Sequence, residues 1–166
     1  MSYAAPTLAG FISFVQTFLA PPAPFDPTTD GTMDFAFQVS CQIVYQGLQL
    51  VTSPIGPVNP DWQLYSLAVY NLGTDTLINY VQDGPNAPVY KDDMPYWQWL
   101  RSKYGINDFQ PGLVTSSADQ GTSVGFQVLP QIASMTMANL QQLKTPFGRR
   151  YLAFAGQWGP LWGLTP

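Results

Sequence analysis

The spacing of apolar residues along the chain predicts a mainly α-helical protein. In residues 7–19 apolar side chains recur every three or four positions, which is the period of one face of an α-helix. Residues 32–51 carry a longer stripe of the same kind. Its members are Phe37, Cys41, Val44, Leu48 and Val51. Because Phe35, Val39 and Ile43 widen this stripe, we expect the helix to be buried on more than one side.

A third helix is predicted over residues 60–82. Asn59 can cap its start, and Pro60 stands at the first helical position, where its fixed φ angle favours helix entry. Gly73 interrupts the apolar pattern and lowers helix stability by about 1 kcal/mol relative to alanine. We therefore expect the helix to bend or end at Gly73 and to resume through Val81.

Two more helical segments follow in the second half of the chain. One covers residues 94–104, with Asp93 as its predicted cap. The other covers residues 131–158 and is predicted to form two helices. Thr145 can cap the second of these, and Pro146 suits its first turn.

The helical pattern is interrupted over residues 113–128. Two β-prone runs flank a turn-forming stretch there, which predicts a β-hairpin or an extended loop with one strand. Val124, Phe126 and Val128 alternate with small or polar residues, so they share one apolar face. A lone hairpin is only marginally stable in water, so this one must pack on the helices or add to a strand of another chain.

The predicted fold is therefore a helical bundle, mainly α, with a β-hairpin or extended loop before the C-terminal helix and an extended C-terminal arm. Residues 1–159 form a single domain, and residues 160–166 form the arm. The arm carries Leu161, Trp162 and Leu164 without regular spacing. An unattached apolar arm promotes aggregation, so we expect it to dock on a partner; the alternative is an arm folded onto its own subunit.

The composition further predicts a surface with few charged side chains. Charged residues make up 10% of the chain, against about a quarter in typical soluble domains, while 46% of residues are apolar. We expect other protein to cover much of such a surface. The net charge of −4 disfavours a protein that grips nucleic acid by its phosphates. No apolar run approaches membrane-spanning length and the N-terminus has no basic region, so we expect neither a membrane span nor export.

The sequence lacks the residues on which most enzymes depend. It has no histidine and a single cysteine, Cys41, which excludes His-based catalysis, an intrachain disulfide and a thiolate metal cluster. The adjacent pair Asp92–Asp93 suits a solvated helix entry better than a catalytic or metal site. No glycine-rich phosphate loop occurs. We therefore expect no enzyme activity, no cofactor and no metal.

The order of these segments resembles the small helical-bundle head–tail connector (adaptor) proteins of tailed bacteriophages. In that family a stretch like Val114–Phe126 precedes the last helix. That helix opens with a pattern matched here by Thr145, Pro146, Phe147, Gly148 and Tyr151. The family's central helix is similar to residues 60–82, with matching positions at Tyr65, Ala68 and Leu72. The proline-rich residues 21–27, the glycine at 73 and the insertion 129–144 depart from the family pattern.

The resemblance implies a structural virion protein that forms a ring, twelvefold in most members, between portal and tail. The implied partners are further copies of the chain, the portal protein and a downstream stopper or tail-completion protein. DNA passes through the lumen without specific binding. The implied location is the neck of the virion, after synthesis in the host cytoplasm.

Two groups of residues are predicted to make the contacts of such a ring. The intersubunit contacts are Val124, Phe126, Val128, Arg149 and Arg150. The portal contacts are Leu161, Trp162 and Leu164. For the two arginines, which would pair with aspartates across the ring, the alternative is a role as exposed helix charges.

Two other functions stay open at this point. The first is another part of the virion, such as a capsid decoration or tail-completion protein. The second is a small-ligand-binding helical module, with Trp97, Trp99 and Tyr104 forming the pocket.

Overall fold

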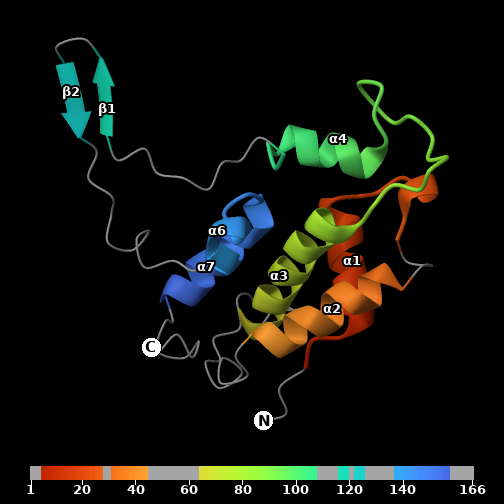
Figure 1. Cartoon of the computed structure of the whole chain (residues 1–166). Helices are drawn as coiled ribbons and strands as arrows, with labels where there is room; N and C mark the ends of the chain where they lie inside the picture. Colours follow the sequence, from red (N-terminus) through yellow and green to blue (C-terminus); the bar gives the residue numbers. More distant parts are fainter. Residues whose placement is uncertain are drawn as a thin grey trace.

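The structure is a computed structural model that describes residues 5–27, 31–44, 64–107, 116–119, 122–125 and 137–157. The helices in these residues are α1 (Leu8–Phe18), the 3₁₀-helix η1 (Ala23–Phe25), α2 (Thr32–Ile43), α3 (Leu64–Tyr80), α4 (Tyr96–Lys103), α6 (Met137–Gln142) and α7 (Pro146–Gln157). The strands are β1 (Ser116–Asp119) and β2 (Thr122–Gly125). The fold is mainly helical, as the spacing of apolar residues predicts (Figure 1).

Helix α3 forms the centre of the bundle. Every residue of α3 is buried except Leu67, Asn79 and Tyr80. Figure 1 shows that α1 and α2 lie along one side of α3, while α6 and α7 lie along the other. A helix buried along most of its length is held mainly by tertiary packing and only weakly by its intrinsic helix propensity.

Two buried polar side chains of α3 donate hydrogen bonds to the backbone of the same helix, whereas Oγ of Ser66 and Oδ1 of Asn71 have no hydrogen-bond partner. The amide of Asn71 donates to the Leu67 carbonyl at 2.7 Å, and the hydroxyl of Thr74 donates to the Tyr70 carbonyl at 2.7 Å. A buried donor left without a partner would cost about 1–3 kcal/mol. These bonds allow α3 to carry polar residues inside the bundle.

Gly73 lies where α1 and α2 both come close to α3. A Cβ atom at this position would lie 2.8 Å from Cε2 of Phe11 on α1 and 3.3 Å from Oγ of Ser40 on α2. The helix end expected at Gly73 is wrong, because α3 runs without interruption from Leu64 to Tyr80. The glycine permits the close approach of α1 and α2 to α3.

Helix α1 confirms the prediction for residues 7–19. Thr7 is its N-cap, and the Thr7 hydroxyl accepts a hydrogen bond from the backbone N–H of Gly10 at 3.0 Å. The backbone N–H of Thr7 donates to the hydroxyl of Tyr70 at 3.2 Å, which fixes the start of α1 against α3. Phe11 and Val15 are fully buried.

Helix α2 is shorter and more exposed than predicted. It ends at Ile43, and Val44 has an extended backbone with ψ of 123°. Only 1% of the Val44 side chain is exposed, so it reaches the core from outside the helix. Residues 45–51 lie outside the described residues. Phe35 and Ile43 are each 53% exposed, so the predicted burial on more than one side is wrong, because α1 and α3 cover one face only.

The aspartate pair before α4 forms a tight turn and not a helix cap. Asp92 and Asp93 both have left-handed backbones, with φ of 52° and 56°. They connect Lys91 to Met94, and the backbone N–H of Met94 donates to the Lys91 carbonyl at 2.9 Å. Aspartate tolerates this conformation better than most residues with a Cβ atom.

Asp83 caps α4 in place of the predicted Asp93. The helix begins at Tyr96 after Pro95, which has no side-chain acceptor. The carboxylate of Asp83 accepts hydrogen bonds from the backbone N–H groups of Trp97 at 3.3 Å and Gln98 at 2.9 Å. The prediction failed because the cap comes from a distant residue and not from the residues next to the helix.

The prediction of a helix that opens at Thr145 and Pro146 is confirmed. Pro146 is the first residue of α7, and the Thr145 hydroxyl accepts a hydrogen bond from the backbone N–H of Gly148 at 2.9 Å. The buried face of α7 consists of Phe147, Tyr151 and Ala155. These side chains pack against α3 and attach the C-terminal helices to the bundle.

Strands β1 and β2 pair antiparallel within residues 113–128, with Ser117 opposite Val124. In Figure 1 this pair lies apart from the helices. Phe126, Val128 and the predicted arm, residues 160–166, lie outside the described residues.

We predict that replacing Gly73 with alanine destabilises the bundle. Alanine is normally the better helix former by about 1 kcal/mol, but here its methyl group would overlap the Phe11 ring. Overpacking of this kind costs about 1–3 kcal/mol, so the free energy of unfolding should fall. Urea unfolding followed by circular dichroism measures the change.

Gly156→Ala is the matched control for this prediction. Gly156 is exposed on α7, and nothing lies within 4 Å of a Cβ atom added there. We expect this variant to be as stable as the parent chain or up to about 1 kcal/mol more stable. A gain of stability in both variants would contradict the close contact at Gly73.

Candidate functional site

A groove runs between α2, α3 and α6, with a volume of about 460 Å³. Phe35, Val39 and Ile43 form its α2 wall. Its floor on α3 extends from Leu72 to Tyr80, and Gln141, Gln142 and Lys144 close the third side. The groove is therefore formed by α3 itself, by α2 and by the region of α6.

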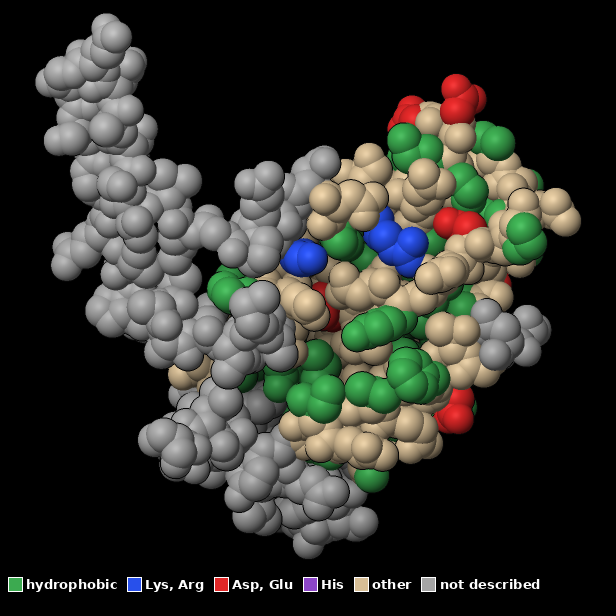
Figure 2. Space-filling view, viewed as in Figure 1, with side chains coloured by type: hydrophobic (Ala, Val, Ile, Leu, Met, Phe, Trp, Pro, Cys, Tyr) green, Lys and Arg blue, Asp and Glu red, His purple; other side chains and the backbone are tan. Residues whose placement is uncertain are grey.

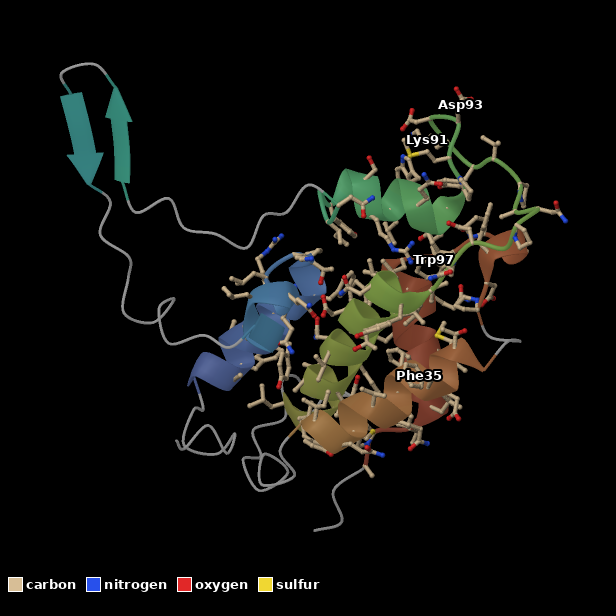
Figure 3. The ribbon with its side chains drawn as sticks, in the orientation of Figure 1. Phe35, Lys91, Asp93 and Trp97 are labelled. Atoms are coloured by element: carbon tan, nitrogen blue, oxygen red, sulfur yellow. The ribbon has the colours of Figure 1, made fainter. Side chains whose placement is uncertain are left out.

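Large apolar side chains are left uncovered along this groove. Phe35 and Ile43 are each 53% exposed, and Tyr80 is 66% exposed. Phe35 and Ile43 are eight residues apart on one face of α2, two turns of helix, and Val39 lies between them. Figure 2 shows hydrophobic side chains gathered on this face, and Figure 3 shows Phe35 on α2. A continuous apolar strip of this kind is a typical protein-binding surface.

The floor of the groove contains a buried carboxyl group. Asp75 is 5% exposed, and its Oδ1 accepts a hydrogen bond from the hydroxyl of Thr145. The same Thr145 hydroxyl accepts a hydrogen bond from the backbone N–H of Gly148. A chain of hydrogen bonds therefore joins the middle of α3 to the first turn of α7.

Burial raises the pKa of Asp75 to about 7. Loss of hydration disfavours the charged carboxylate and is the dominant cause. Hydrogen bonds from Thr145 and Asn79, and the positive charge of Lys144, act in the opposite direction and lower the pKa. Asp75 therefore changes its charge close to neutral pH.

Gln142 places an unsatisfied acceptor beside Asp75. The side chain is 9% exposed, and Oε1 has no hydrogen-bond partner in the structure. Gln142 also lines the groove. An unpaired buried acceptor costs free energy, so Gln142 is a locally unfavourable part of the packing beneath the groove.

The motif Thr-Pro-Phe-Gly at 145–148 has a structural explanation in this arrangement. A Cβ atom at Gly148 would collide with the backbone carbonyl of Gln142 and would lie 2.8 Å from Oδ1 of Asp75. Only glycine fits between α6, α7 and α3 at this point. The motif therefore fixes the C-terminal helices on α3 and shapes one end of the groove.

The aromatic cluster on α4 divides into a core residue and a rim residue. Trp97 is 2% exposed, and its indole N–H donates to the Phe25 carbonyl at 3.1 Å (Figure 3). Trp99 is partly exposed, with the ammonium groups of Lys91 and Lys103 at 5.6 Å and 5.0 Å from its ring centroid. Trp97 is therefore part of the core, whereas Trp99 lies at its rim beside two lysine side chains.

The arginines predicted to contact other subunits are both exposed on α7. The guanidinium of Arg149 donates to the Leu143 carbonyl at 3.0 Å, and Arg150 is exposed on the next position. One bond within the subunit leaves further guanidinium donors of Arg149 available. Val124 lies on β2, where its side chain is not described, and the other predicted contacts lie outside the described residues.

Sequence reasoning missed the residues that make this groove distinctive. The apolar spacing predicts burial for Phe35 and Ile43, and it gives no prediction for Asp75 or Gln142. A signal for Asp75 was present, because a lone carboxylate in the middle of an apolar helix is unusual. Gln142 has no comparable signal, since an unpaired amide depends on its surroundings.

The described parts of the chain contain neither a metal-binding cluster nor a membrane-spanning helix. No group of three or more His, Cys, Asp or Glu side chains in them could hold a metal ion. No helix in them is long and apolar enough to cross a bilayer.

Comparison of the chain with protein-family models, with curated proteins and with solved structures finds no match.

We predict that Asp75 makes the stability of the bundle depend on pH. Its pKa is about 7 in the folded chain against 3.8 for a free aspartate, so the folded state holds the proton more tightly. The resulting stabilisation is complete below about pH 4 and disappears as the pH rises through 7. Unfolding free energies from urea titrations between pH 4 and 8 should therefore decline more steeply in the parent chain than in Asp75→Asn.

Asp34→Asn on α2 is the matched control, because it removes a carboxyl group at an exposed position. The difference between Asp75→Asn and this control isolates the contribution of the buried carboxyl group. Identical profiles for the parent and Asp75→Asn would show that Asp75 does not titrate near neutral pH.

Proposed function

We propose that this chain is a structural subunit that assembles with copies of itself into a ring. We further propose that the ring is the head–tail connector of a tailed bacteriophage, placed between the portal and a downstream stopper or tail-completion protein. The resemblance of the Thr145–Tyr151 motif and of the segment order to connector proteins supports the viral part of this proposal.

The observation that carries the assembly proposal is the open apolar groove. Phe35, Ile43 and Tyr80 expose about half or more of their surface along it. Only 10% of the chain is charged, so few charges compensate for this apolar surface. Cover by a neighbouring subunit would remove the apolar strip from water.

The net charge supports the proposal that DNA passes through the ring without being bound. A net charge of −4 per copy gives a ring with excess negative charge, which disfavours tight contact with phosphates. A channel of this kind lets DNA pass without specific binding. The role of the ring is then mechanical, and the chain needs neither a catalytic site nor a cofactor.

The β1–β2 hairpin and the C-terminal arm supply the remaining contacts in this proposal. Val124, Phe126 and Val128 contact a neighbouring subunit, and Arg149 and Arg150 add polar contacts across the ring. The arm binds the portal through its apolar residues, which are Leu161, Trp162 and Leu164. Trp162 is the main anchor, because buried tryptophans often dominate binding energy.

Another virion role remains the alternative function, since a decoration or tail-completion protein would need similar contacts. A ligand pocket at the aromatic cluster of α4 loses support because the indole of Trp97 is in the core and bonded to Phe25. The hollow beside Trp97 has a volume of about 140 Å³. Typical small-molecule pockets measure about 300–1,000 Å³, so this hollow is too small for most ligands.

We predict that the native protein is a closed ring of many copies. Native mass spectrometry should give a mass many times 18.3 kDa, and electron microscopy should show the ring at one vertex of the particle. A decoration protein would instead cover the capsid surface. A single 18.3-kDa species both in solution and in purified particles would overturn the proposal.

We predict that a chain truncated after Gly159 still folds but no longer docks on the portal. All helices of the described structure end before this residue, so circular dichroism should show the helical content of the full chain. The truncated subunit should no longer join portal-containing particles, as measured by co-sedimentation. Trp162→Ala in the full chain should cause most of the same loss. Normal incorporation of the truncated form would rule out anchoring by the arm.

A further inference from the structure

The groove between α2, α3 and α6 fits an occupant that brings apolar side chains. Phe35, Ile43 and Tyr80 line the groove and are exposed. An extended strand suits such a groove, since its side chains project from its faces at regular intervals.

We propose that the occupant is the segment Val124–Val128 of a second copy of the chain. This inference rests on the proposed self-assembly and states where one subunit receives the hairpin of its neighbour. The segment begins in β2 and carries apolar residues at every second position, Val124, Phe126 and Val128. In an extended conformation this spacing places three apolar side chains on one face.

The lengths of the segment and the groove agree. From Phe35 to Ile43 the α2 wall rises by about 12 Å, and the α3 floor from Leu72 to Tyr80 has the same length. Val124 and Val128 are four residues apart, which is about 13 Å in an extended strand. The three apolar side chains therefore span the groove from end to end, with Phe126 at its middle.

The charges also agree. Residues 120–136 contain no charged side chain, so this stretch can enter an apolar groove without burying a charge. Strand β2 pairs with β1 on one edge, and in the described two-stranded sheet its other edge has no partner strand. That edge is therefore open to contact with another surface.

The position of β1 and β2 favours a neighbouring copy as the recipient. In Figure 1 the pair lies apart from the helices of its own chain. An isolated two-stranded hairpin is marginally stable at best in water, so it gains stability by packing on another surface. The groove provides that surface on the adjoining subunit, and each copy then both donates a strand and receives one.

Disulfide cross-linking between two single-cysteine populations tests the proposal. In a Cys41→Ser background, one population carries Ile43→Cys in the groove, and the other carries Val128→Cys and a size tag. After mixing and oxidation, we expect a tagged heterodimer in the assembled fraction. Val89→Cys replaces Ile43→Cys in the control, because Val89 is 66% exposed but does not line the groove. This control should give little heterodimer.

The outcomes distinguish the docking inference from the proposed function. Assembly without an Ile43–Val128 link would overturn the inference and leave self-assembly intact. A failure of the parent chain to assemble would overturn both. Linking of Ile43→Cys to Leu164→Cys, or mainly to itself, would identify another occupant and also overturn the inference.

A charge substitution provides a second, independent measurement. Ile43→Asp places a carboxylate in the groove at an exposed position, so the subunit should fold but lose most of its assembly. Val89→Asp is the matched control and should assemble as the parent chain does. Native mass spectrometry measures assembly, and circular dichroism checks folding. Full assembly of Ile43→Asp would contradict a strand buried on this wall.

Discussion

The burial of α3 along most of its length is the constraint on which the rest of the structure depends. Because helices pack on two sides of α3, its buried polar side chains need internal partners, and each covering helix needs room to approach. The amide of Asn71 and the hydroxyl of Thr74 meet the first requirement by donating to the preceding turn. Gly73 meets the second, because it leaves space for the Phe11 ring. The bundle is thus organised around one helix whose sequence is adapted to contact on two sides.

Asp75 connects this central helix to the surface. Burying a carboxyl group is costly, and the hydrogen bond from Thr145 offsets only part of that cost, as the raised pKa of Asp75 shows. The same hydrogen-bond network holds the first turn of α7, where Gly148 fits against α6. A polar group that is expensive to bury therefore fixes the C-terminal helices and forms part of the groove floor. Asp75 therefore takes part both in the packing of the helices and in the chemistry of the groove surface.

The sequence predicts the elements of this fold better than their environments. Local spacing is sufficient to identify α1 and the start of α7, because helix periodicity and capping act within a few residues. It fails for the cap of α4, where Asp83 replaces the neighbouring Asp93 through a contact across a loop. It fails again for Phe35 and Ile43, whose spacing resembles that of core residues. Their exposure depends on whether another element packs on the outer side of α2, and the spacing of residues within α2 cannot show this. The groove at the candidate site is therefore visible only in the folded chain.

The proposed contact between a groove on one copy and a strand on another would be heterologous, because the two surfaces that meet are different. Repetition of such a contact closes into a ring when the rotation between neighbours divides a full turn evenly, and continues as an open filament when it does not. Both assemblies would cover Phe35 and Ile43 equally well, so hydrophobic burial cannot select between them. The choice must come from contacts that fix the angle between neighbours. Arg149 and Arg150 are suited to this role. Both are exposed on α7, and guanidinium groups form hydrogen bonds with strict geometry. Apolar contact would then supply the affinity of the assembly, and directional polar contact would supply its closure.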